Sequence, residues 1–288
     1  SALTDRPKPD FGRRTSSEEF TSEVLAIKEE IRSGEAFQVV LSQRFEMDCK
    51  SDSIDVYRML RLKNPSPYMY YLRFGDGVDI VGSSPEALVK VKNREVMVHP
   101  IAGTRKRSEN PEQDEKIAQE LLADPKERAE HLMLVDLGRN DLGRVCESGS
   151  VEVVQFMNIE KYSHVQHIVS NVEALLEEGL DDIDVLKASF PAGTLTGAPK
   201  VRAMEVIDDM EKTRRGIYGG AVGYLSWSGH MDVAIAIRTG IVKDKMLNVQ
   251  AAAGIVYDSS PEAEWQETEM KARAVLKAAE LVENGLEH

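Results

Sequence analysis

The sequence is poor in cysteine and contains no long apolar run. Only two of its 288 residues are cysteines, Cys49 and Cys146, and their spacing matches no metal-binding or redox motif. No stretch approaches the roughly 20 apolar residues that cross a membrane, and no signal peptide opens the chain. We therefore expect free thiols, no membrane partner and a cytoplasmic location.

Positive charge is also scarce. The chain carries 36 Lys and Arg against 49 Asp and Glu, for a formal net charge of -13. Nonspecific nucleic-acid binding needs a basic face for the phosphates, so we expect no nucleic-acid partner. A small anionic substrate in a local pocket of Arg and Lys remains compatible with this charge. The 42% hydrophobic and 30% charged residues are typical of a globular protein.

Hydrophobic periodicity predicts helices and strands that arrive in separate runs. The expected helices span 17–33, 53–63, 111–123, 125–137, 183–189, 198–211 and 261–283. The expected strands span 38–47, 69–74, 78–83, 87–92, 95–99, 151–157 and 164–172, followed by an antiparallel meander of 218–227, 232–242 and 246–256. This order favours an α+β fold with antiparallel sheet and helices packed outside. Residues 1–16 are expected to be a linker, 17–283 one domain, and 284–288 a tail with a tag remnant.

A glycine- and hydroxyl-rich segment, Ser189–Met204, precedes an expected helix. Gly193 and Gly197 permit close backbone approach, and Thr194 offers a hydroxyl. The N–H groups of a helix start suit an anion, here a carboxylate rather than a phosphate, because the phosphate-loop pattern is missing. Binding of an anion and an ordinary helix start are both compatible with these residues.

Two pairs of glutamates recur at a spacing of three. Glu127 and Glu130 share one helix face, and Glu264 and Glu267 repeat the spacing on the last helix. Such faces are usually only solvated. If both pairs faced one pocket, they would offer the oxygen ligands that Mg²⁺ prefers.

Two further residues allow a functional and a structural interpretation. Arg238 stands in the apolar run 232–239, where it either pairs with an anion or points outward from a half-exposed strand. His167 shares a strand face with Val165 and Val169, so it is either a core residue or a catalytic group.

Five separated motifs together resemble the chorismate-utilising enzymes over about residues 17–283. They are Pro100-Ile-Ala-Gly-Thr-Arg105, Glu130–Asp141, Ser189–Met204, Tyr218–Tyr224 and Glu264–Lys271. The resemblance implies two large antiparallel β-sheets packed across each other with helices outside. It also implies that 17–283 forms a chorismate-binding catalytic domain.

Two positions distinguish the branches of this family. Relatives that add water to chorismate carry a lysine base where this chain has Gln38, and aminodeoxychorismate synthases carry a nucleophilic lysine where it has Ala102. Glutamine does not deprotonate water, whereas ammonia needs no strong base, and alanine offers no nucleophile. The sequence therefore resembles the large subunits of anthranilate synthases.

That branch implies a lyase of tryptophan biosynthesis. It converts chorismate and ammonia to anthranilate and pyruvate, with ammonia supplied by a glutamine amidotransferase subunit. One alternative is aminodeoxychorismate synthase of folate biosynthesis. Another is a chorismate-binding fragment with little turnover.

The resemblance also assigns roles to residues. Glu86 would be the general acid at the departing hydroxyl and His167 would act in pyruvate elimination, with Gln38 and Thr194 completing the catalytic set. Glu127, Glu130, Glu264 and Glu267 would hold Mg²⁺. Gly103, Thr104, Tyr218, Arg238, Ala252, Gly254 and Lys271 would bind the substrate.

Two departures from the family pattern affect these expectations. Ala252 stands where the family usually has glycine, and its methyl group would reduce affinity or activity. Pro67, Tyr68 and Met69 match part of a tryptophan feedback site. The remainder of that site belongs to an N-terminal segment of whole large subunits, so we do not expect feedback inhibition of this chain.

Overall fold

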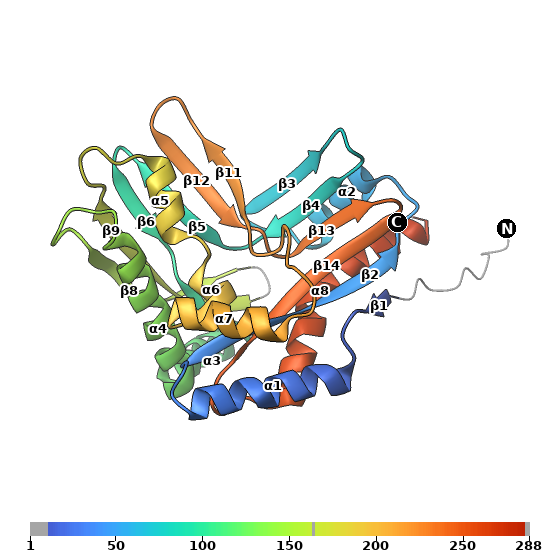
Figure 1. Cartoon of the computed structure of the whole chain (residues 1–288), viewed down its shortest axis with the longest axis horizontal. Helices are drawn as coiled ribbons and strands as arrows, with labels where there is room; N and C mark the ends of the chain where they lie inside the picture. The colour runs from blue at the N-terminus through green and yellow to red at the C-terminus, as the bar shows by residue number, and fades with distance from the viewer. Residues whose placement is uncertain (1–10, 163–164, 286–288) are drawn as a thin grey trace. The chain divides into compact units, whose positions relative to one another are not determined.

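The computed structural model describes residues 11–162 and 165–285, and these form two compact units (Figure 1). Unit 1 contains residues 11–85, 194–220 and 236–285. Unit 2 contains residues 86–162, 165–193 and 221–235. The chain therefore leaves unit 1 and returns to it twice.

Unit 1 is built on one antiparallel sheet. Among the described residues its main path runs β1 (Phe11–Arg13), β2 (Gln38–Asp48), β14 (Met246–Ile255), β13 (Thr239–Lys243), β4 (Asp79–Ser84) and β3 (Tyr68–Arg73). A two-residue strand, β10 (Gly197–Ala198), also pairs with β2. The longest ladder joins β2 to β14, from Met246 opposite Asp48 to Ile255 opposite Val39.

The core of unit 1 lies on one face of this sheet. Alternate β2 residues such as Leu41 and Phe45 are fully buried, while Arg44 faces the other side and is half-buried. Four helices supply the apolar partners: α1 (Ser17–Arg32), α2 (Ser53–Lys63), α7 (Lys200–Met210) and α8 (Pro261–Glu283). The start of α1 is fixed by Ser16, whose hydroxyl accepts a hydrogen bond from Glu19 N. A short helix, α6 (Gly193–Thr196), precedes β10.

Unit 2 is built on a second antiparallel sheet. Its path runs β11 (Ala221–Leu225), β12 (His230–Ile235), β5 (Ala87–Lys92), β6 (Glu95–Val98), β9 (Val165–Leu175) and β7 (Ile101–Lys106), and β8 (Glu152–Lys161) also pairs with β9. Its helices are α3 (Pro111–Ala123), α4 (Pro125–Leu142) and α5 (Asp182–Ser189). Asn110 and Asp124 cap α3 and α4, and a proline follows each cap.

The predicted α+β class with antiparallel sheets is confirmed. The helices at 53–63, 111–123 and 261–283 have the predicted bounds, and the 87–92 and 95–99 strands form the expected hairpin as β5 and β6. No helix in the described ranges is long and apolar enough to cross a membrane. The expectation of one catalytic domain over 17–283 stays a prediction.

The predicted meander is wrong in its middle strand. The run 232–242 is not continuous: β12 ends at Ile235 and pairs in unit 2, whereas β13 begins at Thr239 and pairs in unit 1. Arg238 has a φ of 48°, a left-handed conformation that a β-strand does not accommodate. The apolar alternation therefore continues through a point where the backbone leaves the strand, and Arg238 lies outside both strands.

Three smaller expectations also need correction. Residues 11–13 were expected in a linker but form β1, because they pair with β2 and Arg13 forms an ion pair with Glu269 of α8. The helix predicted at 125–137 continues to Leu142. The strand β7, which contains all of the Pro100–Arg105 motif except Pro100, was not predicted at all. Residues 1–10 and 286–288 lie outside the described ranges.

Candidate functional site

The predicted site residues divide between the two units. Unit 1 contains Gln38, Pro67, Tyr68, Met69, Thr194, Tyr218, Arg238, Ala252, Gly254, Glu264, Glu267 and Lys271. Unit 2 contains Glu86, Gly103, Thr104, Glu127, Glu130 and His167. Within each unit the fold brings several of them together from distant parts of the sequence.

A bulge in β7 organises the unit 2 residues. Ala102 pairs with Ile168 and Thr104 with His167, which leaves Gly103 as an extra residue with a φ of 69°. A β-carbon at position 103 would lie 3.0 Å from Glu127 Oε2 and 3.2 Å from Leu121 Cδ1. Glycine is needed here for its backbone conformation and to let the Glu127 carboxylate approach.

His167 is half-buried and bonded to two predicted substrate residues. Its Nδ1 lies 3.1 Å from Gly103 O and 3.0 Å from Thr104 Oγ1. Because a carbonyl oxygen only accepts, the bond to Gly103 places the proton on Nδ1. In the neutral ring Nε2 is then the basic nitrogen, as a proton-accepting role requires. The edge of the ring packs against Tyr162, with centroids 5.6 Å apart.

Glu127 already has a cationic neighbour. Arg105 Nη1 lies 2.8 Å from Glu127 Oε1, and Nη2 lies 3.1 Å from Asp124 Oδ2. Asp124 also caps α4 by accepting from the backbone N–H of Glu127 at 3.3 Å. Glu130 follows one turn later on the same helix. Sequence reasoning missed Arg105, although it ends the Pro100–Arg105 motif.

A buried polar contact fastens α4 to the sheet. His131, next to Glu130, is fully buried with Nε2 2.7 Å from Ser170 Oγ, and Met157 N donates to the same hydroxyl at 2.9 Å. Burial lowers the pKa of His131 to about 4, with a smaller contribution from nearby His99, so the ring is neutral at pH 7. This neutral side chain fixes the helix that carries Glu127 and Glu130.

Glu86 lies where β5 begins. Its carbonyl accepts a hydrogen bond from Ile235 N at 3.0 Å, and the side chain is half-buried. Two residues later, β5 and β12 change register: Val233 pairs with Val89 and Ala234 with Ala87, which leaves Leu88 as a bulge. Bulges next to functional residues redirect side chains. The role of Glu86 as an acid stays a prediction.

In unit 1, Gln38 is held between two glycines. Its side chain is 3% exposed, and a β-carbon on Gly254 would lie 2.6 Å from Gln38 Nε2. On the backbone side, a β-carbon on Gly197 would lie 2.0 Å from Gln38 O. The glycine of the Ser189–Met204 motif therefore permits close backbone contact, as the sequence suggested, but the contact is with β2. The next helix, α7, begins at Lys200. Pro199 occupies its N-cap position, and no side chain accepts a capping hydrogen bond there.

Lys271 links α8 to the strand below it. Its ammonium donates to Ala252 O at 2.9 Å and lies 2.6 Å from Glu267 Oε1. Ala252 is 4% exposed. Glu264, one turn before Glu267, is buried, whereas Glu267 is half-buried. In the parts of the chain that the structure describes, no group of three Asp, Glu, His or Cys side chains forms a metal cluster.

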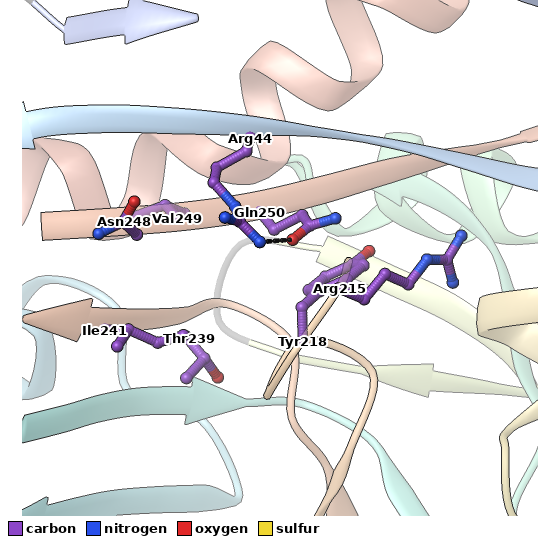
Figure 2. A pocket seen from close by; sticks show the side chains of 8 residues that line it. All are labelled: Arg44, Arg215, Tyr218, Thr239, Ile241, Asn248, Val249 and Gln250. Carbon is purple, nitrogen blue, oxygen red and sulfur yellow. Dashed lines mark hydrogen bonds between the residues drawn. The ribbon is translucent and has the colours of Figure 1, made fainter. Parts of the chain in front are cut away.

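A small pocket lies in unit 1 and includes the predicted substrate residue Tyr218. Its lining comprises Arg44, Arg215, Tyr218, Thr239, Ile241, Asn248, Val249 and Gln250. Figure 2 shows Arg44 reaching toward Gln250, whose Oε1 lies 3.4 Å from Nη2, and Arg215 beside Tyr218. Tyr218 is 9% exposed. The hydroxyl of Thr194 is buried and has no hydrogen-bond partner among the described residues.

Arg238 and the tryptophan-site residues lie elsewhere in unit 1. Arg238 is half-buried, and its carbonyl accepts from Ser83 N at 3.1 Å. Pro67 is exposed, Tyr68 begins β3, and Met69 packs against the core. A role of these residues in tryptophan binding stays a prediction.

An ion pair that was not predicted from the sequence includes Arg215 of the pocket lining. Glu211 and Arg215 are joined at 2.7 Å, and both side chains are largely buried. Opposite charges four residues apart just before the Tyr218 motif were the available signal. Helical pairs at this spacing are usually exposed, so the signal did not stand out.

Known proteins resemble nearly the whole chain. The family model described as chorismate binding enzyme matches residues 3–277. Anthranilate synthase component 1 of Aquifex aeolicus is 56% identical over 283 residues, which cover 97% of this chain and 57% of the relative. The Mycolicibacterium smegmatis protein of that name is 57% identical over 282 residues, which cover 96% of this chain and 54% of that relative.

A solved structure agrees with these similarities. Anthranilate synthase component I from Streptococcus pneumoniae superposes with a TM-score of 0.87 at 48% identity, covering 93% of this chain and 59% of that one. The chain thus spans a little more than half the length of the relatives it matches.

Proposed function

We propose, because this chain belongs to the chorismate-binding enzyme family, that it combines chorismate with ammonia and releases anthranilate and pyruvate. Relatives named anthranilate synthase component 1 are 56% and 57% identical to it, which supports this choice within the family. The reaction needs an acid for the leaving hydroxyl, a path for ammonia and a group to handle the ring proton.

The observation that carries the proposal is the chemistry of positions 38 and 102. The buried side chain of Gln38 is an amide that does not take a proton from water, and Ala102 in β7 has no nucleophile. Ammonia requires neither group, because it is itself the nucleophile. These two residues favour direct amination over hydration or a covalent ring adduct.

The remaining residues take roles that fit their local geometry. Glu86 protonates the departing hydroxyl. His167 accepts a proton at Nε2, since its Nδ1–H bonds to Gly103 O. Tyr218, Arg238 and the Thr194 hydroxyl bind the carboxylate and ring oxygens, and the unpartnered Thr194 hydroxyl supports this role because its hydrogen-bonding capacity remains available.

Mg²⁺ fits the chemistry of the acidic residues. Glu127, Glu130, Glu264 and Glu267 offer only oxygen ligands, which a hard divalent cation prefers. Glu127 already lies beside a positive charge, since its Oε1 is 2.8 Å from Arg105 Nη1. When bound, the ion would neutralise the ring carboxylate of the substrate.

The ammonia source is a second protein in this proposal. The relatives are named component 1, which supports a separate component that supplies ammonia. We propose a glutamine amidotransferase subunit for this role. High concentrations of ammonium at alkaline pH would replace it in an assay.

A binding function without turnover is the second candidate. Ala252 is buried at 4% exposure in β14, and its carbonyl accepts a hydrogen bond from the predicted substrate residue Lys271. Calorimetry with chorismate, run beside an assay for anthranilate fluorescence with Mg²⁺ and ammonium, separates the two. Fluorescent product supports the amination proposal, and binding without product contradicts it.

A further inference from the structure

We propose that Arg215 is a positioning residue that holds Tyr218 and the Thr194–Thr196 turn in place for catalysis. The inference rests on the proposed function, because that function makes Tyr218 and Thr194 substrate ligands. It adds a residue that acts through both of them. All the groups involved lie in unit 1.

Arg215 uses its guanidinium to connect three segments of the chain. Nη1 donates to Leu195 O, and Nη2 donates to Val40 O in β2 at 2.7 Å. Nε and Nη2 also donate to the two carboxylate oxygens of Glu211 at 2.9 and 2.7 Å. A guanidinium has five donors in a fixed planar fork, so these bonds fix its orientation.

This group contacts Tyr218 directly and reaches Thr194 through its neighbour Leu195. Leu195 stands between Thr194 and Thr196 in the sequence. The hydrogen bond from Arg215 to its carbonyl therefore fixes the turn that carries the Thr194 hydroxyl. The guanidinium carbon lies 5.8 Å from the centroid of the Tyr218 ring. Tyr218 N also donates to Arg215 O at 3.2 Å. A shift of Arg215 would therefore displace both ligands together.

The ion pair with Glu211 keeps the guanidinium in this position. The side chains of Arg215 and Glu211 are only 18% and 6% exposed. Glu211 is further fixed by Ser42, whose backbone N–H and hydroxyl donate to it at 2.8 and 2.7 Å. Removing one partner of a buried pair leaves an uncompensated charge, so single variants lose stability as well as positioning.

A double variant separates stability from positioning. Arg215→Met leaves the Glu211 carboxylate buried without its cation, and Glu211→Gln removes that charge. We expect Arg215→Met to lower Tm, and Glu211→Gln/Arg215→Met to recover most of the loss. In both variants kcat/KM for chorismate should fall about 10- to 100-fold, because small displacements of ligands cost rate steeply. Arg215→Lys keeps the charge but loses the fork, so it should recover stability better than activity.

The matched control is Arg202→Met. Arg202 on α7 also bonds to several carboxylates, those of Glu30, Glu35 and Glu205, none of which is a predicted site residue. This variant should keep wild-type kcat and KM. If the double variant regains wild-type kcat/KM along with its Tm, Arg215 is only structural and the proposal is overturned.

Hydrogen exchange provides a test that does not depend on turnover. Peptides covering residues 194–198 and 217–220 should exchange faster in the double variant than in Arg202→Met, measured on the whole chain. Unchanged exchange in both peptides would overturn the positioning role. If wild type and Arg202→Met both fail to consume chorismate, the proposed function fails while the exchange data still decide the positioning of these segments.

Discussion

The side chain of Gln38 lies directly over the backbone of Gly254, at a distance that leaves no room for a β-carbon. The two residues are far apart in the sequence, and the ladder between β2 and β14 brings them together. A β-carbon on residue 254 would meet the far end of a flexible amide at 2.6 Å, not a rigid backbone group. The clash would therefore move Gln38 and leave the sheet in place.

Gly254→Ala should consequently affect activity more than stability. We expect a modest fall in Tm and at least a tenfold loss of kcat/KM for chorismate, since the Gln38 amide is displaced. The measurement is a double-mutant cycle in thermal unfolding with Gln38→Ala. In the Gln38→Ala background the added methyl should cost almost no stability. An equal cost in both backgrounds would show that the methyl clashes with something other than Gln38.

Glu86→Gln should retain the fold and chorismate binding but lose turnover. An amide of nearly the same size keeps the packing at the start of β5 but delivers no proton. General acids contribute about 10²–10⁴-fold in rate, and a loss of this size in kcat with little change in the dissociation constant is expected. Calorimetry and steady-state kinetics on the same preparation measure both quantities. Unchanged kcat would assign the proton to another group.

Arg105→Ala should strengthen Mg²⁺ binding several-fold. The guanidinium lies 2.8 Å from Glu127 Oε1, so its positive charge opposes a cation at that carboxylate. Calorimetric titration with MgCl₂ measures the affinity without turnover. Arg128→Ala is the matched control, because Arg128 is exposed on the same helix and donates to Leu122 O. Unchanged or equally changed affinity in the two variants would remove Glu127 from the ligand set.

Glu23→Gln should make the protein more stable at alkaline pH. Burial raises the pKa of this half-buried α1 carboxyl from 4.5 to about 7, and the negative charge of Glu211 adds to the rise. Below pH 4.5 the group is protonated in both states and costs nothing. As the pH rises from 4.5 to 7, the carboxyl ionises in the unfolded state but stays protonated in the folded state, so stability falls across this window and levels off above pH 7.

The variant should therefore match wild type in acid and exceed it at pH 8. Solvent exposure reduces the penalty to about 1 kcal/mol, which corresponds to a Tm increase of roughly 2–4 °C. Thermal scans between pH 4 and 8 measure the difference. Glu29→Gln, on the exposed side of the same helix, is the matched control for replacing a carboxylate by an amide on α1. A Glu23→Gln curve parallel to wild type at all pH values would show that Glu23 ionises normally.

Elements with local signals were predictable from the sequence. Asn110-Pro111 and Asp124-Pro125 each place a cap before a proline, and the helices α3 and α4 begin there. The hairpin of β5 and β6 follows from a short polar turn, where Asn93 and Arg94 have positive φ. The strand break at Arg238 was not predictable in this way, because the apolar pattern runs on through a residue that tertiary structure holds at a φ of 48°.

The contacts among the candidate site residues were not predictable from the sequence. Motif resemblance pointed to Gly103, Glu127 and His167 separately. Their contact depends on the bulge in β7 and on the register with β9, which are set by pairing between distant segments. Arg215 had no comparable motif signal, because a buried and an exposed charge pair look alike in sequence. Whether a charge pair is buried or exposed depends on the neighbouring side chains, and these come together only in the folded chain.

The product formed from chorismate with ammonium and Mg²⁺ tests the central proposal most directly. Chromatography of the wild-type reaction should show anthranilate, with no para isomer and little isochorismate or salicylate. Gln38→Lys should gain product from water addition, because a lysine at a 3% exposed position is desolvated and loses its proton more readily. Wild-type formation of 4-amino-4-deoxychorismate or salicylate as the main product would contradict the account.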